Sequence, residues 1–402
     1  MKNDFIKIQR NGWIWNIKKS LIQNGFLENI QDSTKKIPIK SNTNRDVFNI
    51  KYQNKLYYVK HYHASGKTSR FLNCFFPKCK AEYESFNILF EKGIRTAEIA
   101  GWGIKNNQSM LITEELKGFI DAKKIWFSDA LSDVKSKNIF KNDLEKLVSK
   151  MISAKIYHPD FHLGNILYNP YIQEIAVIDA HGVKKIVKYN KNKLIDMLCV
   201  FGAIRGEITD NEAEERIGNI LSSSKVPGLN LSPRCLWQKI LINESLETEK
   251  LWEKRRKQIL SHNSKYINKI ECNGKIWLTR KKISGSPEIN VEEIDQIQKK
   301  SSERIKVLNP DTAEKIWLKS FHLQFHRIMH IMPIAWCNEN NTGKLIYEEI
   351  TEKARIVNGE LLDEFLNRCK IAGFNIINKN ACFSSQNVIF CEIGNIKITK
   401  GC

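Results

Sequence analysis

The segment from Tyr157 to Val183, YHPDFHLGNILYNPYIQEIAVIDAHGV, limits the possible folds of this chain more than any other. NILY and IAVID within it have the composition of short strands, and the turn residues NPYIQE separate them. Asp160 lies five residues before Asn165, and Asp179 ends the second strand. The segment is therefore either a loop that binds a metal-bound phosphate or a polar strand–turn–strand unit without that role.

The length and composition indicate a globular protein of several domains. A chain of 402 residues is long enough for two or three domains, and its 42% of hydrophobic residues can form their cores. No stretch approaches the roughly 20 apolar residues of a membrane-spanning helix. The N-terminus interrupts its apolar residues with charges, unlike a secretion signal, and the ten cysteines lack zinc-site spacing. We therefore expect reduced thiols and a cytoplasmic location.

The formal charge of +20 fits a nucleic acid, an anionic membrane surface or a phosphate-bearing substrate. The sequence has no zinc-finger or RNP-type signature, and its lysines are spread along the chain rather than gathered in a tract. We therefore expect no nucleic-acid partner. An anionic acceptor and peripheral contact with the anionic inner membrane surface remain expectations.

The first hundred or so residues predict the order strand, strand, helix, strand, strand. Residues 35–62 alternate apolar and polar positions around two turns, and apolar residues recur at helix spacing over 80–91. Gly93 ends that helix, and residues 97–104 and 109–116 form two more strands. Downstream, residues 141–155 place five apolar side chains on one helix face.

Phosphoryl transfer from ATP requires a cation on the phosphates, a carboxylate near the acceptor hydroxyl and one or two magnesium ions held by oxygen ligands. Asp160 would accept or orient the hydroxyl, while Asn165 and Asp179 would hold the metal. Gly182 would let the chain turn sharply just after the second aspartate.

The remaining parts of such a site lie upstream. Lys60, in the strand LYYVKHY, would point inward at the phosphates, and Glu82 in the following helix would pair with it. Glu115 and Leu116 end the strand LITEEL, where backbone groups would meet the adenine base. Each part alone is commonly structural, but five parts in this order favour a phosphate site.

The motifs resemble those of the protein-kinase-like superfamily, and most of all its lipopolysaccharide kinase branch, which phosphorylates Kdo or heptose. The resemblance covers roughly residues 10–205 and rests on IKSNTNRDVFNIKYQNKLYYVK, AEYESFNILFEKGIRT, LITEEL, YHPDFHLGNILY and IAVIDAHGV. It implies an α+β, bilobal fold with an antiparallel N-lobe sheet plus a helix and a mainly helical C-lobe. It also implies ATP and Mg²⁺ as cofactors.

The same resemblance implies roles for individual residues. Lys60 and Glu82 would form the ion pair, Asp160 would be the catalytic base, and Asn165 and Asp179 would be magnesium ligands. His158, the first residue of the His-x-Asp loop, is included in the implied catalytic set.

Several positions depart from the protein-kinase pattern. The phosphate-covering hairpin at residues 40–47 has no glycine, so Ser41, Thr43 and Asn44 with backbone N–H groups would bind the phosphates. Pro159 replaces the arginine that reads activation-loop phosphorylation, and Ala180 and His181 replace the usual phenylalanine switch. We therefore expect neither control by such phosphorylation nor a protein-kinase-style switch. His162, an extra polar residue in the loop, resembles the small-molecule kinases of the superfamily.

The second half of the chain echoes the first. GKIWLTRKK (274–282) aligns with NKLYYVKHY (54–62), and IMPIAWCNENNTGKLIYEEI (331–350) aligns with residues 97–116. In this alignment Arg280 stands at the Lys60 position and Ile316 at the Glu82 position. SSQNVIF would match the end of the catalytic loop, with Cys382 five residues before Asn387, and 283–306 would be a longer loop. Chance similarity between two mixed α/β stretches is the alternative.

These observations predict a catalytic domain at residues 1–245, with an N-lobe over about 1–116 and a C-lobe over about 117–245, followed by a degenerate, truncated kinase-like domain at 246–402. The expected activity is ATP-dependent phosphorylation of a sugar hydroxyl of lipopolysaccharide core or a related glycolipid. Two alternatives stay open. One is an inactive pseudokinase-like scaffold, and the other is a kinase that acts on protein or another small molecule.

Overall fold

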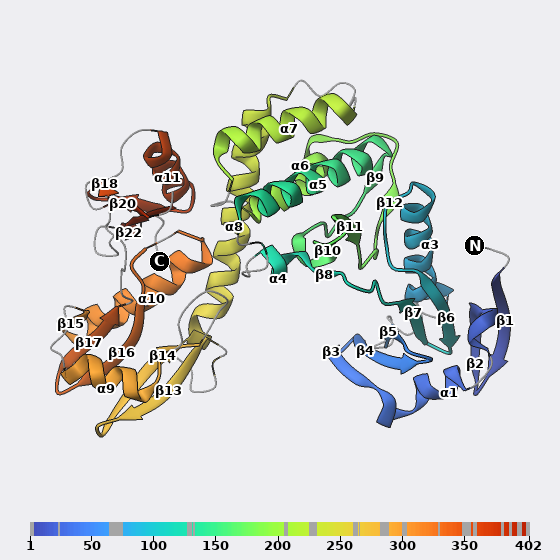
Figure 1. Ribbon diagram of the computed structural model, residues 1–402, viewed down its shortest axis with the longest axis horizontal. Helices are drawn as coiled ribbons and strands as arrows, with labels where there is room; N and C mark the ends of the chain where they lie inside the picture. The colour runs from blue at the N-terminus through green and yellow to red at the C-terminus, as the bar shows by residue number, and fades with distance from the viewer. Residues whose placement is uncertain are drawn as a thin grey trace. The chain divides into compact units, whose positions relative to one another are not determined.

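The computed structural model of the chain (Figure 1) divides into two compact units, residues 1–200 with 218–230 and residues 201–217 with 231–402. The structure describes residues 4–398 except 23–24, 64–74, 127–130, 132, 205–207, 225–230, 260–263, 265, 282–288, 300–303, 329, 348–354, 357–359, 379–381, 386–387 and 392–395. The boundary predicted at residues 245 and 246 falls inside the helix α8 (Pro233–Ile259) and stays a prediction. In the described part of the chain, no helix combines the length and apolarity needed to cross a membrane.

The first unit begins with an antiparallel sheet of seven strands. The strands are β1 (Phe5–Arg10), β2 (Trp13–Lys18), β3 (Ile37–Asn42), β4 (Arg45–Tyr52), β5 (Lys55–Tyr62), β6 (Ile99–Lys105) and β7 (Gln108–Glu114). Their order in the sheet is β1-β2-β6-β7-β5-β4-β3. The β1–β2 hairpin was not expected from the sequence, although Asn11-Gly12, with φ of 52° and 77°, is the dipeptide that a tight hairpin turn favours.

A helix covers each face of this sheet. Trp15, Ile17 and Phe48 are buried in one core with the short helix α1 (Phe26–Gln31). The helix α3 (Lys78–Glu91) packs on β6 and β7 and buries Phe86 and Leu89. It ends where expected, since Gly93 has a φ of 65° and Ile94 N–H closes back on Leu89.

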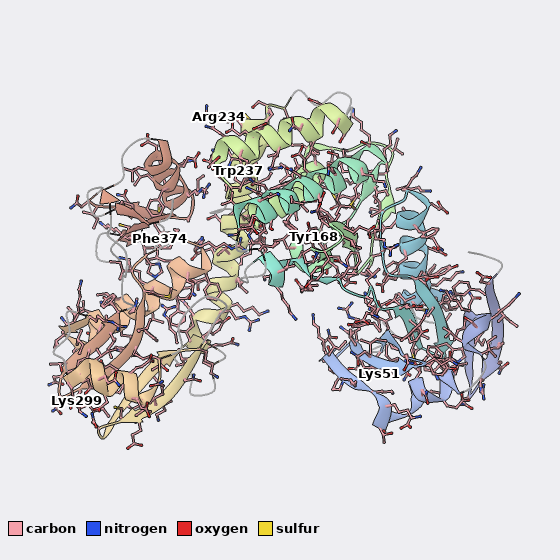
Figure 2. All side chains as sticks on the ribbon, in the orientation of Figure 1. Lys51, Tyr168, Arg234, Trp237, Lys299 and Phe374 are labelled. Atoms are coloured by element: carbon pink, nitrogen blue, oxygen red, sulfur yellow. The ribbon has the colours of Figure 1, made fainter. Side chains whose placement is uncertain are left out.

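The rest of the first unit is mainly helical, as predicted for the C-lobe. It contains β8 (Ile120–Asp121), α4 (Ala122–Trp126), α5 (Val134–Ser153), β9 (Ile156–Tyr157), β10 (Ile166–Asn169), β11 (Glu174–Val177) and β12 (Lys184–Lys185). The helices α6 (Lys191–Gly202) and α7 (Asp210–Ser224) follow, and each crosses the division between the two units. Tyr168 of β10, labelled in Figure 2, packs its ring against Phe140 of α5 at 5.0 Å, which joins the strand pair to the helix before it.

The second unit has its own sheets and core. Its elements are α8, β13 (Ile267–Cys272), β14 (Lys275–Arg280), α9 (Val291–Lys299), β15 (Ile305–Leu308), α10 (Pro310–Phe325), β16 (Pro333–Glu339), β17 (Thr342–Tyr347), β18 (Arg355–Ile356), α11 (Glu360–Ile371), β19 (Phe374–Ile376), β20 (Cys382–Ser385), β21 (Val388–Cys391) and β22 (Ile396–Ile398). Trp317 and Phe321 of α10 are fully buried in its core.

The loop expected at residues 283–306 is wrong for much of its length. Helix α9 occupies 291–299 and buries Ile294 and Ile297 on one face. Its start is a capping box, because Asn290 Oδ1 accepts the Glu293 N–H at 2.9 Å and Glu293 Oε2 accepts the Asn290 N–H at 3.0 Å. Residues 305 and 306 already belong to β15.

The two units repeat one strand order. The order β13-β14-β16-β17-β15 matches β1-β2-β6-β7-β5, the order β21-β20-β18 matches β11-β10-β8, and the pair β19-β22 matches β9-β12. Isolated parallel bridges recur as well, between Thr96 and Val177 in the first unit and between His330 and Cys391 in the second. The topology therefore supports an internal repeat, and the kinase-like nature of the second unit stays a prediction.

The strand order corrects the alignment of Arg280 with Lys60. Strand β14 takes the position of β2, and β15 takes that of β5. Lys60 lies opposite Leu111, the fourth residue of β7, and Lys306 lies opposite Leu345, the fourth residue of β17. Lys306 is therefore the counterpart of Lys60.

Two other parts of the predicted alignment have different outcomes. Helix α10 ends as α3 does, with Arg327 at a φ of 55° and Ile328 N–H bonded to Leu323 O, so Ile316 keeps the Glu82 position. The predicted alignment matched SSQNVIF to the end of the catalytic loop, which continues into β10. In the structure the strand in this segment, β21, has the position of β11 instead. Asn387 lies outside the described residues.

Candidate active site

Lys60 and Glu82 form the ion pair predicted from the sequence. Lys60 Nζ lies 2.5 Å from Glu82 Oε1. The second carboxylate oxygen of Glu82 accepts a hydrogen bond from the Tyr62 hydroxyl, and Glu82 is fully buried. Because a buried carboxylate is costly without partners, the pair and the tyrosine hold Glu82 in the core under the sheet.

Asp179 is the second anion on Lys60. Its Oδ1 lies 2.8 Å from Lys60 Nζ, and its Oδ2 lies 3.6 Å from Arg45 Nη1. Burial by itself would raise the pKa of Asp179, but the charges of Lys60, Arg45 and His181 and the Lys60 hydrogen bond hold it below its ordinary value. Asp179 is therefore an anion at neutral pH, and its φ of 56° is a left-handed conformation often found at functional sites.

The loop from His158 to Asn165 brings Asp160 and Asn165 together. Asn165 Nδ2 donates to the Asp160 backbone oxygen at 2.9 Å and to Asp160 Oδ2 at 3.2 Å. In this orientation the amide oxygen of Asn165 is left for a cation. Asn165 is buried, whereas the Asp160 side chain is 69% exposed and can meet a substrate from solvent.

His158 supports this loop from below. It is fully buried, its ring lies 5.7 Å from that of Phe161, and its Nδ1 accepts the Asp160 N–H at 3.2 Å. Burial lowers the pKa of His158 to about 4, so the ring is neutral at pH 7 and Nδ1 can accept that proton. These contacts favour a positioning role for His158 rather than contact with substrate.

Backbone contacts join the Asp160 loop to Asp179. Ile178 N–H donates to Asn165 O at 2.9 Å at the end of the β10–β11 pair, which sets Asn165 beside Asp179. Ser85 Oγ, one turn after Glu82, donates to Val183 O at 2.9 Å, so α3 is tied to the same segment. The five predicted groups thus come from elements that are bonded to one another.

Gly182 turns the chain after Asp179, as predicted. Its φ is 79°, and a Cβ at this position would lie 2.9 Å from Pro159 Cγ. Only glycine meets both conditions without strain, since a side chain would disfavour the conformation and press on the catalytic loop. The glycine therefore allows two loops of the site to touch.

The hairpin between β3 and β4 places the three predicted phosphate-binding residues in different positions. Ser41 lies opposite Asp46, which lies opposite His61, so these three share the sheet face that Lys60 does not. Ser41 Oγ donates to Asp46 Oδ1 at 2.5 Å. Thr43 and Asn44 form the exposed turn. Phosphate binding by the backbone of these residues stays a prediction.

Arg45 is a site residue that the sequence reasoning missed. It lies opposite Tyr62 in the β4–β5 register, and it therefore shares a face with Lys60. Burial would lower the pKa of Arg45, yet the Asp179 and Glu82 carboxylates raise it above its ordinary value. Counting pairs outward from the Gln53-Asn54 turn would have found it.

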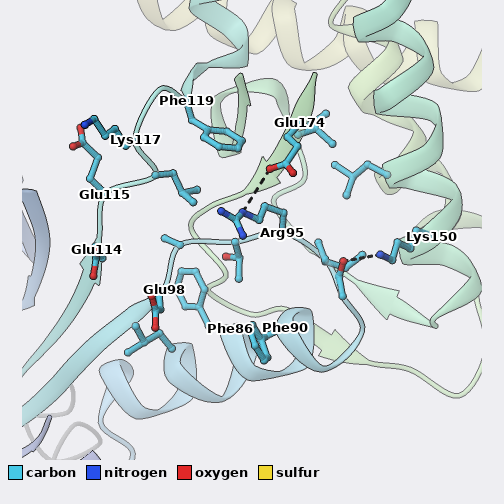
Figure 3. A pocket seen from close by; sticks show the side chains of 18 of the residues that line it. Phe86, Phe90, Arg95, Glu98, Glu114, Glu115, Lys117, Phe119, Lys150 and Glu174 are labelled. Carbon is cyan, nitrogen blue, oxygen red and sulfur yellow. Dashed lines mark hydrogen bonds and ion pairs between the residues drawn. The ribbon is translucent and has the colours of Figure 1, made fainter. Parts of the chain in front are cut away.

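The two predicted hinge residues, Glu115 and Leu116, line a cavity of about 880 Å³ (Figure 3). The cavity lies among α3, α5 and the segment before β6, and none of Lys60, Asp160 and Asp179 lines it. Across it Arg95 faces Glu174 at 3.9 Å, and Lys150 donates to Gly93 O at 2.6 Å. This cavity is therefore separate from the carboxylate cluster, and the adenine contact of the hinge stays a prediction.

A family model described as the lipopolysaccharide kinase (Kdo/WaaP) family matches residues 35–212. Those residues include Lys60, Glu82, Asp160, Asn165 and Asp179. These residues make up less than half of the chain, and over them the sequence resembles the lipopolysaccharide kinase family. The match agrees with the predicted family and kinase class over these residues. The antiparallel sheet with its helices and the mainly helical part after it agree with the predicted α+β fold.

The chain is also similar to solved structures at low identity. WaaP in complex with acyl carrier protein is 15% identical with a TM-score of 0.36, and the match covers 55% of this chain and 87% of that one. The PF14_0431 kinase domain is 14% identical with a TM-score of 0.30, covering 48% and 76%. The Cydia pomonella granulovirus kinase PK-1 is 14% identical with a TM-score of 0.31, covering 46% and 75%. No curated protein matches the sequence significantly.

Proposed function

We propose that this kinase transfers phosphate from ATP to a hydroxyl of an anionic saccharide or glycolipid, such as lipopolysaccharide core, at the cytoplasmic face of the inner membrane. The observation that carries the proposal is the arrangement around Lys60, whose Nζ contacts both Glu82 and Asp179. A cation between two anions, next to an exposed aspartate, matches the needs of phosphoryl transfer. A scaffold without catalysis has no physical need for this set.

The residues present fit Mg²⁺ and a nucleotide. Asp179 and Asn165 offer a carboxylate and an amide oxygen, which are the hard ligands that Mg²⁺ prefers. When bound, Mg²⁺ neutralises charge on the phosphates. Lys60 would move part of its contact from Asp179 to a phosphate oxygen, while Glu82 keeps the ammonium in position. Arg45, on the same face, would offer a second cation to the phosphates.

Asp160 is suited to the acceptor hydroxyl. Its carboxylate projects into solvent, and Asn165 and the neutral His158 hold its backbone. His162 Nε2 lies 3.4 Å from Asp160 Oδ1, and its Nδ1 accepts the Gly164 N–H at 3.0 Å. Asp160 would accept a hydrogen bond from the hydroxyl and orient its oxygen toward the transferred phosphoryl group.

A lysine-rich segment beside the loop favours an anionic acceptor. Residues 184–193 contain five lysines and closely follow Asp179 in the sequence. β12 pairs with β9, which leads into the Asp160 loop, and Lys184 and Lys193 lie 6.0 Å and 5.7 Å from the Tyr157 ring centre. Phosphate or carboxylate groups of a saccharide would bind here, and so would an anionic membrane surface.

The chemistry is tested with the full chain, labelled ATP, Mg²⁺ and a Kdo-containing lipopolysaccharide core as acceptor. Asp160→Asn and Asp179→Asn keep the shape of the side chains and remove their charges, so we expect each to lower acceptor phosphorylation by at least about 100-fold. Asp133→Asn is the matched control, because Asp133 caps α5 away from the site and asparagine caps equally well. Equal activity in all four proteins would refute the assignment.

The acceptor class is tested separately. The double variant Lys184→Glu/Lys193→Glu should raise KM for the anionic acceptor about tenfold or more and leave KM for ATP unchanged, with Lys250→Glu/Lys254→Glu in α8 as the charge-matched control. An unchanged KM would exclude this segment from acceptor binding. Mg²⁺-dependent ATP binding without transfer to any saccharide would instead favour the scaffold, or a kinase acting on protein or another small molecule.

A further inference from the structure

In the second unit, two histidines and a glutamate converge at one point. His322 Nε2 and His326 Nε2 each lie 2.9 Å from the same oxygen, Glu249 Oε2. His322 lies in the last turn of α10, and His326, four residues later, is the C-cap residue of that helix. The glutamate comes from α8. The three ligand atoms all lie within 4.8 Å of one another. We propose that this cluster is a zinc site that joins α8 to α10.

The spacing suits a small divalent cation. Zinc bonds to imidazole nitrogen and carboxylate oxygen are about 2.0–2.2 Å long, so tetrahedral ligand atoms lie roughly 3.3 Å apart. The observed 2.9 Å needs an opening of only a few tenths of an ångström. Each imidazole would carry its proton on Nδ1 and present Nε2 to the metal. Two histidines and a glutamate leave one tetrahedral position for water.

The surroundings hold the rings in this orientation. The His322 ring stacks on Trp252 of α8 with centres 4.6 Å apart and planes at 7°. Phe374, labelled in Figure 2, packs its ring edge-on at 4.9 Å from His322, and lies 5.4 Å from the His326 ring. Both histidines are buried, whereas the Glu249 side chain is 35% exposed and gives an ion a way in. An apolar shell of this kind orders metal ligands and limits water access.

The ligand types favour a transition metal. Two imidazole nitrogens and one carboxylate oxygen meet at one point. Neutral imidazole with one carboxylate suits Zn²⁺ better than Mg²⁺ or Ca²⁺.

The fold itself does not require histidines here. The counterparts of His322 and His326 on α3 of the first unit, set by the matching helix ends, are Ile88 and Lys92. The same helix thus packs in the same topology without these imidazoles. The metal site would belong to the second unit alone, where its effect would be to stabilise the α8–α10 contact.

The alternative is a hydrogen-bonded cluster without metal, in which both Nε2–H groups donate to Glu249. Glu249→Gln distinguishes the two, because its amide oxygen still accepts both hydrogen bonds but is a poor zinc ligand. His326→Gln removes a ligand outright. His330→Gln is the matched control, since His330 is buried in the same unit and bonds to Ser320 and to Ile328 O instead.

The test uses the full chain, stripped with EDTA, reloaded with ZnCl₂ and dialysed. Wild type and His330→Gln should retain one Zn²⁺ per chain, and both Glu249→Gln and His326→Gln should lose it. Zinc at a hundredfold excess over its Kd should raise the melting temperature of wild type by about 5–10 °C and leave that of Glu249→Gln unchanged.

Cobalt substitution excludes the cysteines as ligands. Co²⁺ bound at this site should show d–d bands without a thiolate charge-transfer band. No retained zinc in wild type, equal retention in Glu249→Gln, or a thiolate band would each overturn the proposal. Because Glu249→Gln keeps the hydrogen bonds, the comparison holds even where His326→Gln fails to fold.

Discussion

Lys60 of β5 and Lys306 of β15 occupy the same place in two sheets of the same strand order. Lys60 lies opposite Leu111, and Lys306 lies opposite Leu345. Their partners differ, since Lys60 contacts Glu82 and Asp179, whereas Ile316 stands at the Glu82 position of α10. Lys306 is exposed, with its Nζ 5.4 Å from the centre of the Tyr347 ring. The lysine position therefore recurs in the second unit, but the glutamate that would hold the ammonium group in place does not.

The two lysines should consequently differ in their effect on catalysis. Lys60→Met removes the ammonium group that contacts both carboxylates, so we expect kcat/KM for ATP to fall at least about 100-fold. Lys306→Met is the matched control and should leave kcat/KM within about twofold. Steady-state kinetics with the saccharide acceptor measures both. A comparable loss in Lys306→Met would mean that the second unit takes part in the reaction.

The order of elements in the first unit was largely predictable from the sequence, and the register of the repeat was not. Hydrophobic periodicity identified α3 and α5 because each buries a continuous apolar face. The alignment of residues 274–282 with 54–62 also implied a strand at β14, but period-2 patterns look alike in every strand of a sheet. The neighbour of β14 is set by long-range pairing, and the short alignment could not distinguish the β2 position from that of β5.

The active-site residues likewise fall into those that were predictable from the sequence and those that were not. Lys60, Glu82, Asp160, Asn165 and Asp179 were found because motif spacing along the chain reflects their chemistry. Their contacts with one another agree with that prediction, while their catalytic roles stay predictions. Arg45 was not predicted because its ion pair with Asp179 depends on strand register rather than on a motif. The histidine pair at the end of α10 was not predicted because its carboxylate partner lies far away in the sequence.

Gly182 offers a second prediction, about stability. Gly182→Ala would force a side chain into a φ of 79° and place its Cβ 2.9 Å from Pro159 Cγ. We expect the free energy of unfolding to fall by about 1–3 kcal/mol, and activity to fall with it because the Asp160 loop must move. Urea denaturation of wild type, Gly182→Ala, Pro159→Ala and the double variant separates the two causes. Pro159→Ala should relieve the contact but not the backbone strain. A double variant with the same free energy of unfolding as Gly182→Ala would therefore exclude the contact with Pro159 as a cause of the destabilisation.

His158 offers a third prediction, about pH. Burial lowers its pKa from an ordinary value of 6.5 to about 4 in the folded protein. His158 therefore binds a proton near pH 6.5 in the unfolded chain, but only near pH 4 in the folded chain. The stability linked to His158 is present above pH 6.5 and is lost as the pH falls through this window, by about 2 kcal/mol between pH 7 and pH 5.

The measurement compares the free energy of unfolding at pH 7 and pH 5 in wild type and in His158→Asn. The asparagine does not titrate, and its side-chain oxygen can accept the Asp160 N–H in place of Nδ1. The variant should therefore lose about 2 kcal/mol less than wild type on acidification, with His162→Asn as the control, since His162 is an exposed histidine on the same loop. The same pH dependence in His158→Asn and wild type would show that His158 is not buried in its neutral form. It would also remove the basis for its positioning of Asp160.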